Sequence, residues 1–137
     1  MDNPTCPETG RPMVRGEQPM TINYKGCSAT FDMPGWFCEA SGESIHTGED
    51  MKVSDRELKR LKAKVEGLLL PEDVRRIRAR LGLTQKDAGQ LIGGGLNAFQ
   101  KYESGEVLVS HAMTSALILL DRDPAGLTLL RQRTAGD

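Results

Sequence analysis

The pattern of apolar and polar residues changes near residue 54. Before that point, short stretches rich in β-branched and aromatic residues predict strands at residues 20–24, 29–33 and 35–38. The glycine-containing segment 25–28 predicts a turn between the first two strands. After residue 54, apolar residues recur every three or four positions, which predicts helices. The chain therefore consists of a β-rich first part and a helical second part.

The first helical segment predicts where one domain ends. Ser54 followed by Glu57 three residues later is typical of a helix N-terminus. Gly67 and Pro71 then bracket a boundary, because glycine favours a helix end and proline a helix start. We therefore expect an N-terminal domain over residues 1–67 and a C-terminal domain over residues 68–137.

Residues 71–133 predict five short helices. Pro71 opens the first, Thr84 caps the second and Ser110 caps the fourth. The glycines at 93–95 predict a tight turn between the second and third helices. Two short helices joined in this way are typical of a helix-turn-helix domain. The fold class expected from the pattern is therefore α+β, with a small β-rich domain followed by an all-α domain of five helices.

One face of the third of these helices carries candidate base-reading residues. Asn97, Gln100 and Lys101 lie at positions i, i+3 and i+4, so they share a face. Phe99 and Tyr102 are predicted to point the other way, into the core. In a helix-turn-helix domain such a face enters the DNA major groove, where Asn recognises adenine and Lys recognises guanine. The alternative is that these are ordinary surface residues.

Several polar and basic residues are candidates for phosphate contacts. The N-terminus of the second helix presents backbone N–H groups that suit a phosphate. The predicted contacts are Thr84, Gln85, Lys86, Arg75 and Arg78. For the two arginines the alternative is an ion pair with Glu72 or Asp73 in their own helix.

Composition and charge narrow the class of protein. Hydrophobic residues make up 38% of the 137 residues and charged residues 27%, which is typical of a folded soluble protein. No apolar stretch is long enough to span a membrane and the N-terminal residues lack the apolar segment of a signal peptide, so we expect a cytoplasmic protein. The net charge is −4 over residues 1–53, +5 over 54–101 and −2 over 102–137, which favours a positive surface in the middle segment. The alternative is a solvated helix face.

No arrangement of residues predicts an enzyme. The chain shows no catalytic triad, no phosphate-binding loop and no carboxylate pair with a defined geometry. The adjacent acids Glu49 and Asp50 are interpreted as solvated loop residues. We therefore expect a binding protein.

Several motifs resemble a known family. Leu83-Thr84-Gln85, Ala88, Ile92-Gly93 and Tyr102-Glu103-Ser104-Gly105 match the pattern of the Xre/Cro/lambda-repressor class. The segment 93–103, GGGLNAFQKYE, is similar to the GGGVNAF-x-[RK]-YE segment of the MqsA antitoxins, and Trp36-Phe37-Cys38 agrees as well. The resemblance implies a zinc-finger-like N-terminal domain that binds a ribonuclease toxin. It also implies a C-terminal domain that dimerises and represses its own operon at a palindromic operator in double-stranded DNA. Asn97 and Lys101 match the family's base-reading positions, with Lys101 in the place of an Arg.

The chain departs from this family at the zinc site. The family pattern is two C-x-x-C pairs about thirty residues apart, whereas this chain has CPET at 6–9 and CEAS at 38–41. Because neutral hydroxyls are poor zinc ligands compared with thiolates, we expect no zinc and no other cofactor. The weak candidates for a metal site are Cys6, Cys38, Cys27 and His46. The alternative is a domain without metal, packed around Phe31, Trp36 and Phe37 with Cys6 and Cys38 as small buried residues.

The function expected from these patterns is that of a dimeric repressor that is also the antitoxin of a type II toxin–antitoxin pair. One alternative is a helix-turn-helix regulator of a mobile-element or other operon that has no toxin partner. Another is a metal- or redox-responsive module that senses through its three cysteines, Cys6, Cys27 and Cys38.

Overall fold

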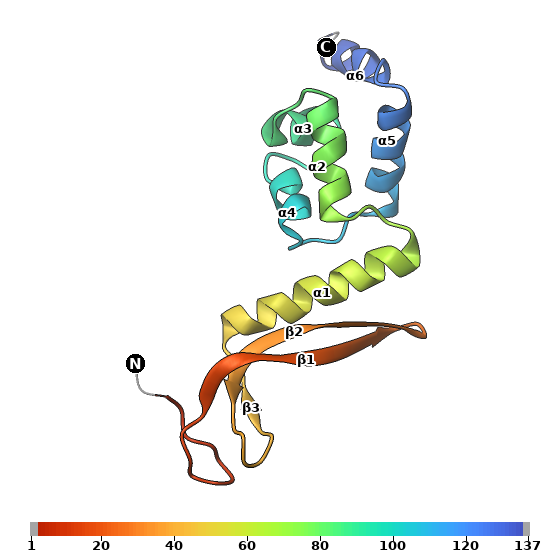
Figure 1. The fold of residues 1–137 in the computed structure, drawn as a ribbon. Helices are drawn as coiled ribbons and strands as arrows, with labels where there is room; N and C mark the ends of the chain where they lie inside the picture. The colour runs from red at the N-terminus through yellow and green to blue at the C-terminus, as the bar shows by residue number, and fades with distance from the viewer. Residues whose placement is uncertain (1–2, 136–137) are drawn as a thin grey trace. The chain divides into compact units, whose positions relative to one another are not determined.

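A computed structural model describes residues 3–135, which form two compact units that divide between Leu61 and Lys62 (Figure 1). Over these described residues a three-stranded antiparallel sheet is followed by six helices, so the α+β class is confirmed. Five of the helices are those expected after residue 71, and the sixth precedes them. No helix within residues 3–135 has both the length and the hydrophobicity needed to cross a membrane.

The first unit contains a long β-hairpin. β1 (Val14–Tyr24) and β2 (Cys27–Phe37) pair along their whole length, from Val14 opposite Phe37 to Tyr24 opposite Cys27. The predicted strands at 29–33 and 35–38 are therefore one strand, because Pro34 and Gly35 stay in register with β1 instead of breaking the ladder. The short β3 (Ser44–Ile45), which the sequence pattern did not predict, pairs with the end of β2.

The helix that follows begins earlier than its sequence predicts. α1 spans Gly48–Glu66, whereas Ser54 was the expected N-terminal cap. Thr47 and Asp50 cap the helix instead: the Thr47 amide donates to Asp50 Oδ2 at 2.9 Å and the Asp50 amide to Thr47 Oγ1 at 3.2 Å. Ser54 lies inside the helix, and its hydroxyl donates to the Met51 carbonyl. The Ser54 prediction is wrong because two neighbouring segments carry the same capping pattern.

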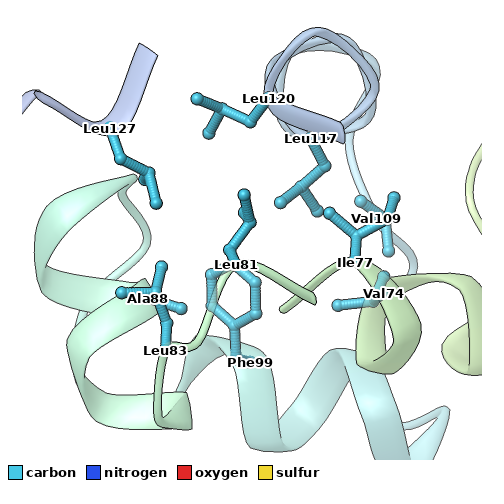
Figure 2. Close-up of a cluster of buried hydrophobic side chains, with 10 residues drawn as sticks. All are labelled: Val74, Ile77, Leu81, Leu83, Ala88, Phe99, Val109, Leu117, Leu120 and Leu127. Atoms are coloured by element: carbon cyan, nitrogen blue, oxygen red, sulfur yellow. The ribbon is translucent and has the colours of Figure 1, made fainter. Parts of the chain in front are cut away.

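The five remaining helices surround one aliphatic core (Figure 2). They are α2 (Pro71–Arg80), α3 (Gln85–Leu91), α4 (Ala98–Ser104), α5 (His111–Arg122) and α6 (Gly126–Ala135). Each contributes to the buried cluster of Val74, Ile77, Leu81, Leu83, Ala88, Phe99, Val109, Leu117, Leu120 and Leu127. The predicted inward positions of Phe99 and Tyr102 are confirmed, with their rings 5.6 Å apart in an edge-to-face contact.

The predicted helix caps in this unit are confirmed. Thr84 Oγ1 accepts the Asp87 amide at 3.1 Å, and Ser110 Oγ accepts the Met113 amide at 3.1 Å. Gly105 ends α4 in the left-handed conformation at φ 82°, which favours glycine. These local signals give the second unit its helix boundaries.

Candidate functional site

The exposed face of α4 carries the residues predicted to read bases. Phe99 is fully buried, which fixes the rotation of the short helix and leaves Gln100 and Lys101 exposed on its other side. Asn97 is the N-cap residue and is also exposed. All three residues are thus exposed at or near the start of α4, and Asn97 and Lys101 line the same surface hollow.

The turn before α4 depends on a buried glycine that the sequence did not single out. The Gly89 carbonyl accepts the Gly95 amide at 3.2 Å, which closes the turn from α3. A Cβ atom on Gly89 would lie 1.9 Å from the Gly95 carbonyl oxygen, so only glycine fits there. The sequence feature from which this close approach could have been inferred is a glycine inside a predicted helix.

A hollow of about 430 Å³ lies beside the predicted base-reading residues. Its lining includes Asn97 and Lys101 together with the apolar Leu96 and Val107. Leu96 is 50% exposed and Val107 42% exposed, an unusual display of apolar surface next to a polar helix face. The small residues Gly94 and Ala98, together with Tyr102, also line this hollow.

The candidate phosphate contacts differ in the exposure of their side chains and in the hydrogen bonds that these side chains already make. Lys86, at the start of α3, and Arg75, on α2, are exposed. Thr84 is exposed as well, but its hydroxyl oxygen already accepts the Asp87 amide, and Gln85 is half-buried. Lys86 and Arg75 are therefore the candidates whose charge is accessible.

Arg78 makes internal contacts instead. Its Nε donates to Glu103 Oε2 at 2.7 Å and its Nη2 to Glu103 Oε1 at 2.9 Å, while Nη1 donates to the Leu83 carbonyl. The two side chains are 17% and 7% exposed. The hydrogen bonds that the guanidinium donates to Glu103 raise the pKa of Arg78. Its partner is thus neither Glu72 nor Asp73, the two acids suggested by its own helix, and the ion pair joins α2 to α4.

In the first unit, two equivalent turns hold the cysteines, and we call them the knuckles (residues 6–11 and 38–43). In each knuckle the cysteine amide donates to the carbonyl five residues on, Cys6 to Arg11 and Cys38 to Glu43. In each, the glycine four residues after the cysteine donates back to the cysteine carbonyl at 2.9 Å. The repeated backbone pattern places Cys6 and Cys38 in matching positions.

The knuckles meet through thiol–hydroxyl contacts, which form what we call the knuckle cluster: Cys6, Thr9, Cys38 and Ser41. Cys6 Sγ lies 3.3 Å from Ser41 Oγ, and Cys38 Sγ lies 3.4 Å from Thr9 Oγ1. Both cysteines are buried and pack with Met13, and Trp36 covers them. Hydrogen bonds from Ser41, then Thr9 and Cys6, lower the pKa of the Cys38 thiol to about 6.

The knuckle cluster does not fit a structural zinc ion. Such sites use four thiolate or imidazole ligands, and here two of the four positions are hydroxyls. Within residues 3–135, no three His, Cys, Asp or Glu side chains lie close enough together to hold a metal. The donor set therefore disagrees with the zinc site that the sequence resemblance implies.

Neither Cys27 nor His46 contributes to the knuckle cluster. Cys27 is exposed at the turn end of β2, ten residues along the strand from Phe37 and so about 33 Å away. His46 Nδ1 bonds to the Pro34 carbonyl at 2.8 Å and Nε2 to Ser44 Oγ at 3.0 Å. The structure brings together Cys6 and Cys38 from the candidate metal set and leaves the other two elsewhere.

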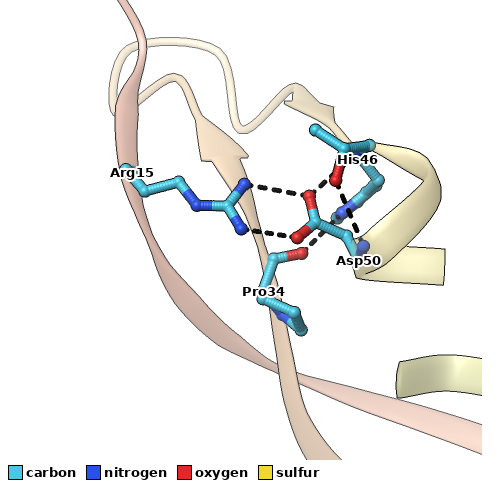
Figure 3. Close-up of polar contacts among 5 residues, drawn as sticks. Arg15, Pro34, His46 and Asp50 are labelled. Carbon is cyan, nitrogen blue, oxygen red and sulfur yellow. Dashed lines mark hydrogen bonds and ion pairs between the residues drawn. The ribbon is translucent and has the colours of Figure 1, made fainter. Parts of the chain in front are cut away.

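Sequence analysis did not predict an ion pair in the first unit between the exposed Arg15 and the buried Asp50 (Figure 3). Arg15 on β1 donates from both terminal nitrogens to the Asp50 carboxylate, and its guanidinium lies 5.6 Å from the centre of the Trp36 ring. The hydrogen bonds from Arg15 hold the pKa of Asp50 well below its usual range. Asp50 is 2% exposed, so its interpretation as a solvated acid is wrong. The Thr47-x-x-Asp50 spacing is the sequence feature from which the capping role of Asp50 could have been inferred.

The fold and these sites define a two-part α+β protein, with a hairpin and paired knuckles in one described unit and five helices with an exposed polar helix face in the other. The model of the MqsA family, the antitoxin component of a bacterial toxin–antitoxin system, matches residues 1–131. The chain is 31% identical over 121 residues to antitoxin MqsA of Escherichia coli (strain K12), covering 87% of this chain and 92% of that protein. The chain therefore belongs to the MqsA antitoxin family.

Proposed function

We propose that this antitoxin is a dimeric, non-enzymatic repressor that binds operator DNA through α4 and neutralises a ribonuclease-type toxin through its first unit. The observation that carries the DNA part is the face of α4: Phe99 is buried while Asn97 and Lys101 are exposed beside the α3–α4 turn. That arrangement matches a helix-turn-helix whose second helix reads the major groove. Asn97 is then the adenine reader and Lys101 the guanine reader, with Gln100 between them.

The accessible charges support a backbone contact next to this face. Lys86 lies in the first turn of α3, where the helix dipole and free amides also favour an anion. Arg75 is a second exposed candidate on α2. Arg78 supports DNA binding indirectly, because its ion pair with Glu103 fixes α4 against α2.

The hairpin supports a protein partner for the first unit. β1 lies at the edge of the described sheet, and nine of its eleven residues are exposed. An exposed edge strand is a template for pairing with another chain. The segment 1–53 carries a net charge of −4, which suits a basic nuclease.

Exposed apolar residues support a second copy as the partner of the second unit. Ile118 and Leu119 on α5 are 50% and 69% exposed, and Leu129 on α6 is 66% exposed. Neighbouring exposed apolar side chains, such as Ile118 and Leu119, are a feature of protein–protein contact surfaces. Two copies would also place two α4 helices on a palindrome whose half-sites are about one DNA turn, or a multiple of it, apart.

Membership of an antitoxin family favours the toxin-paired function over a regulator without a toxin. The alternative of a sensor using three cysteines is disfavoured because Cys27 lies far from Cys6 and Cys38. The toxin hypothesis is tested by calorimetric titration of the protein with the product of the neighbouring gene. Heat of binding at equimolar ratio supports it, and no binding contradicts it.

Fluorescence anisotropy with DNA from upstream of the gene tests the repressor function. The titration is run against scrambled DNA at two salt concentrations. We expect the upstream fragment to bind more tightly at both. Asn97→Ala should reduce the preference between the two fragments, whereas Lys86→Ala should weaken both alike and reduce the salt slope by about one. Lys52→Ala, which removes an exposed lysine in the other unit, is the matched control. Equal binding of both fragments by the unmodified protein would contradict base reading by α4.

A further inference from the structure

We propose that the knuckle cluster holds the two knuckles together in place of a zinc ion, so that the first unit of this antitoxin folds independently of zinc. The four positions that a zinc site would use are occupied and in mutual contact, as the Cys6–Ser41 and Cys38–Thr9 distances show. Each contact crosses from one knuckle to the other. These side-chain contacts therefore join the two knuckles.

The hydroxyls are positioned to donate to the sulfurs. Thr9 Oγ1 already accepts the Arg11 amide at 3.3 Å, and Ser41 Oγ accepts the Glu43 amide at 3.1 Å. Each hydroxyl proton is therefore available to the thiol of the opposite knuckle. The sulfur end of each contact is buried together with Met13, which limits the access of competing water to the two thiols.

The functional consequence is that zinc supply does not regulate this antitoxin. A chain with four thiolates would lose its first unit to a chelator, because zinc binding and folding are coupled in such sites. This chain should retain its partner-binding unit when zinc is scarce.

The test is metal analysis and thermal melting of the full-length protein purified from zinc-supplemented medium, with and without a zinc chelator. We expect essentially no zinc and an unchanged melting temperature with the chelator. Cys27→Ser, which removes the exposed cysteine outside the knuckle cluster, is the control and should give the same zinc content and melting temperature as the unmodified protein. About one zinc ion per chain, lost together with thermal stability on chelation, would overturn the proposal.

A gain-of-function variant tests the geometry. The paired change Thr9→Cys and Ser41→Cys should restore four thiolates and take up about one zinc ion per chain, with a melting temperature that the chelator lowers. Ser41→Ala and Thr9→Val should each lower the melting temperature of the metal-free protein. Thr21→Val, which breaks an exposed hydroxyl pair on the hairpin, is the control and should have less effect. If Ser41→Ala and Thr9→Val melt like the unmodified protein, the cluster does not join the knuckles.

A separate observation carries a second inference, which rests on the proposed DNA binding. We infer that the hollow beside Asn97 receives the C5-methyl group of a thymine. The thymine methyl is the apolar group that base edges present in the major groove. Leu96 and Val107 supply exposed apolar walls to a hollow that Asn97 and Lys101 also line. A base pair next to the one read by Asn97 would bring its methyl group to Leu96.

Deoxyuridine substitution tests this inference, because it removes one methyl group and leaves the base's hydrogen-bonding groups. Thymines of the upstream fragment are replaced one at a time. One replacement should weaken binding about fourfold, the effect expected for exposing one buried methyl. Leu96→Ala should bind the thymine fragment more weakly and should lose the discrimination, whereas Val14→Ala, an exposed valine in the other unit, should retain it. If the fragment binds specifically but no replacement matters, the methyl site is wrong and base reading stands. If the fragment does not bind specifically, the proposed function itself fails.

Discussion

Arg78 and Glu103 form a two-point ion pair across 25 residues of sequence, and the pair fastens α4 to α2. Both side chains are largely buried, at 17% and 7% exposed, and the Arg78 guanidinium also binds the Leu83 carbonyl. A planar guanidinium that satisfies a carboxylate at two points fixes orientation as well as distance. The position of α4, the helix predicted to read DNA, is therefore fixed against α2 by this ion pair as well as by the buried Phe99.

Breaking this ion pair should destabilise the second unit. Arg78→Ala leaves the Glu103 carboxylate buried without its partner, so we expect a loss of about 3–5 kcal/mol in the free energy of unfolding, measured by urea denaturation. Replacing both residues, as Arg78→Met with Glu103→Leu, should recover most of that loss because no charge is then left buried. Arg75→Ala on the exposed side of the same helix is the matched control and should change stability by less than about 0.5 kcal/mol. Equal effects of Arg78→Ala and Arg75→Ala would show that the pair contributes little.

Asp50 should give the first unit a specific sensitivity to acid. Its pKa in the folded protein lies below its ordinary value of 3.8, chiefly through the hydrogen bonds from Arg15. A carboxyl with a lowered folded pKa stabilises the protein at pH values above the unfolded pKa, and that stabilisation is lost as the pH falls through the folded value. The melting temperature should therefore decline from about pH 5 downward.

Asp50→Asn should lower the melting temperature at pH 7 and flatten its decline in acid, as measured by melts monitored through Trp36 fluorescence. Glu49→Gln is the matched control, because Glu49 is exposed and pairs only with the exposed Lys52 among the contacts described for it. An Asp50→Asn variant with the acid profile of the unmodified protein would contradict this assignment.

The comparison of these sites with the sequence pattern shows what local signals can and cannot provide. The caps at Thr84 and Ser110 and the glycine at 105 depend on neighbours within a few residues, so the helices of the second unit were predictable. The start of α1 was not, because Ser54 with Glu57 and Thr47 with Asp50 are equivalent locally. The choice between them depends on Arg15, which is 35 residues from Asp50.

The same distinction applies to the candidate sites. Helical spacing predicts that Phe99 is buried and that Gln100 and Lys101 are exposed, as the structure has them, whereas the base-reading role of Asn97, Gln100 and Lys101 stays a prediction. The contacts that join the knuckles pair residues 29 and 35 positions apart, and only the folded chain brings them together. The spacing of Cys6 and Cys38 indicated a former metal site, whereas the hydroxyl contacts that replace it required the structure.

Gly89 offers a prediction in which two physical effects have opposite signs. Alanine in place of glycine inside a helix normally stabilises by up to about 1 kcal/mol. Here the added methyl would lie 1.9 Å from the Gly95 carbonyl oxygen, so the turn into α4 must shift. We expect Gly89→Ala to cost about 1–3 kcal/mol in urea denaturation and to weaken specific DNA binding. Gly16→Ala, where no atom lies within 4 Å of the new Cβ, should be nearly neutral, and a stabilised Gly89→Ala would show that the turn is not closely packed.

The exposed leucine on α5 provides the sharpest test of dimerisation. Leu119 is 69% exposed, and a second copy that covers it would bury most of an apolar side chain worth about 1.5–3 kcal/mol per protomer. Leu119→Asp places a charge in the same position, which must then be desolvated in the dimer. We expect sedimentation equilibrium to show a dimer for the unmodified protein and a shift toward monomer for the variant. Specific DNA binding should weaken in parallel, since one α4 then reads a single half-site.

Met20→Asp, at an exposed position on the hairpin, is the control for the added charge and should leave the second unit's association unchanged. If Leu119→Asp remains dimeric, the α5 surface is not the contact, and Leu129 on α6 becomes the position to change. If the unmodified protein sediments as a monomer at micromolar concentration, the dimeric repressor is contradicted whatever the variants do. A dimer presents two α4 helices that match the two half-sites of a palindrome, whereas a monomer presents one. The sedimentation result therefore decides whether this antitoxin reads one half-site or two.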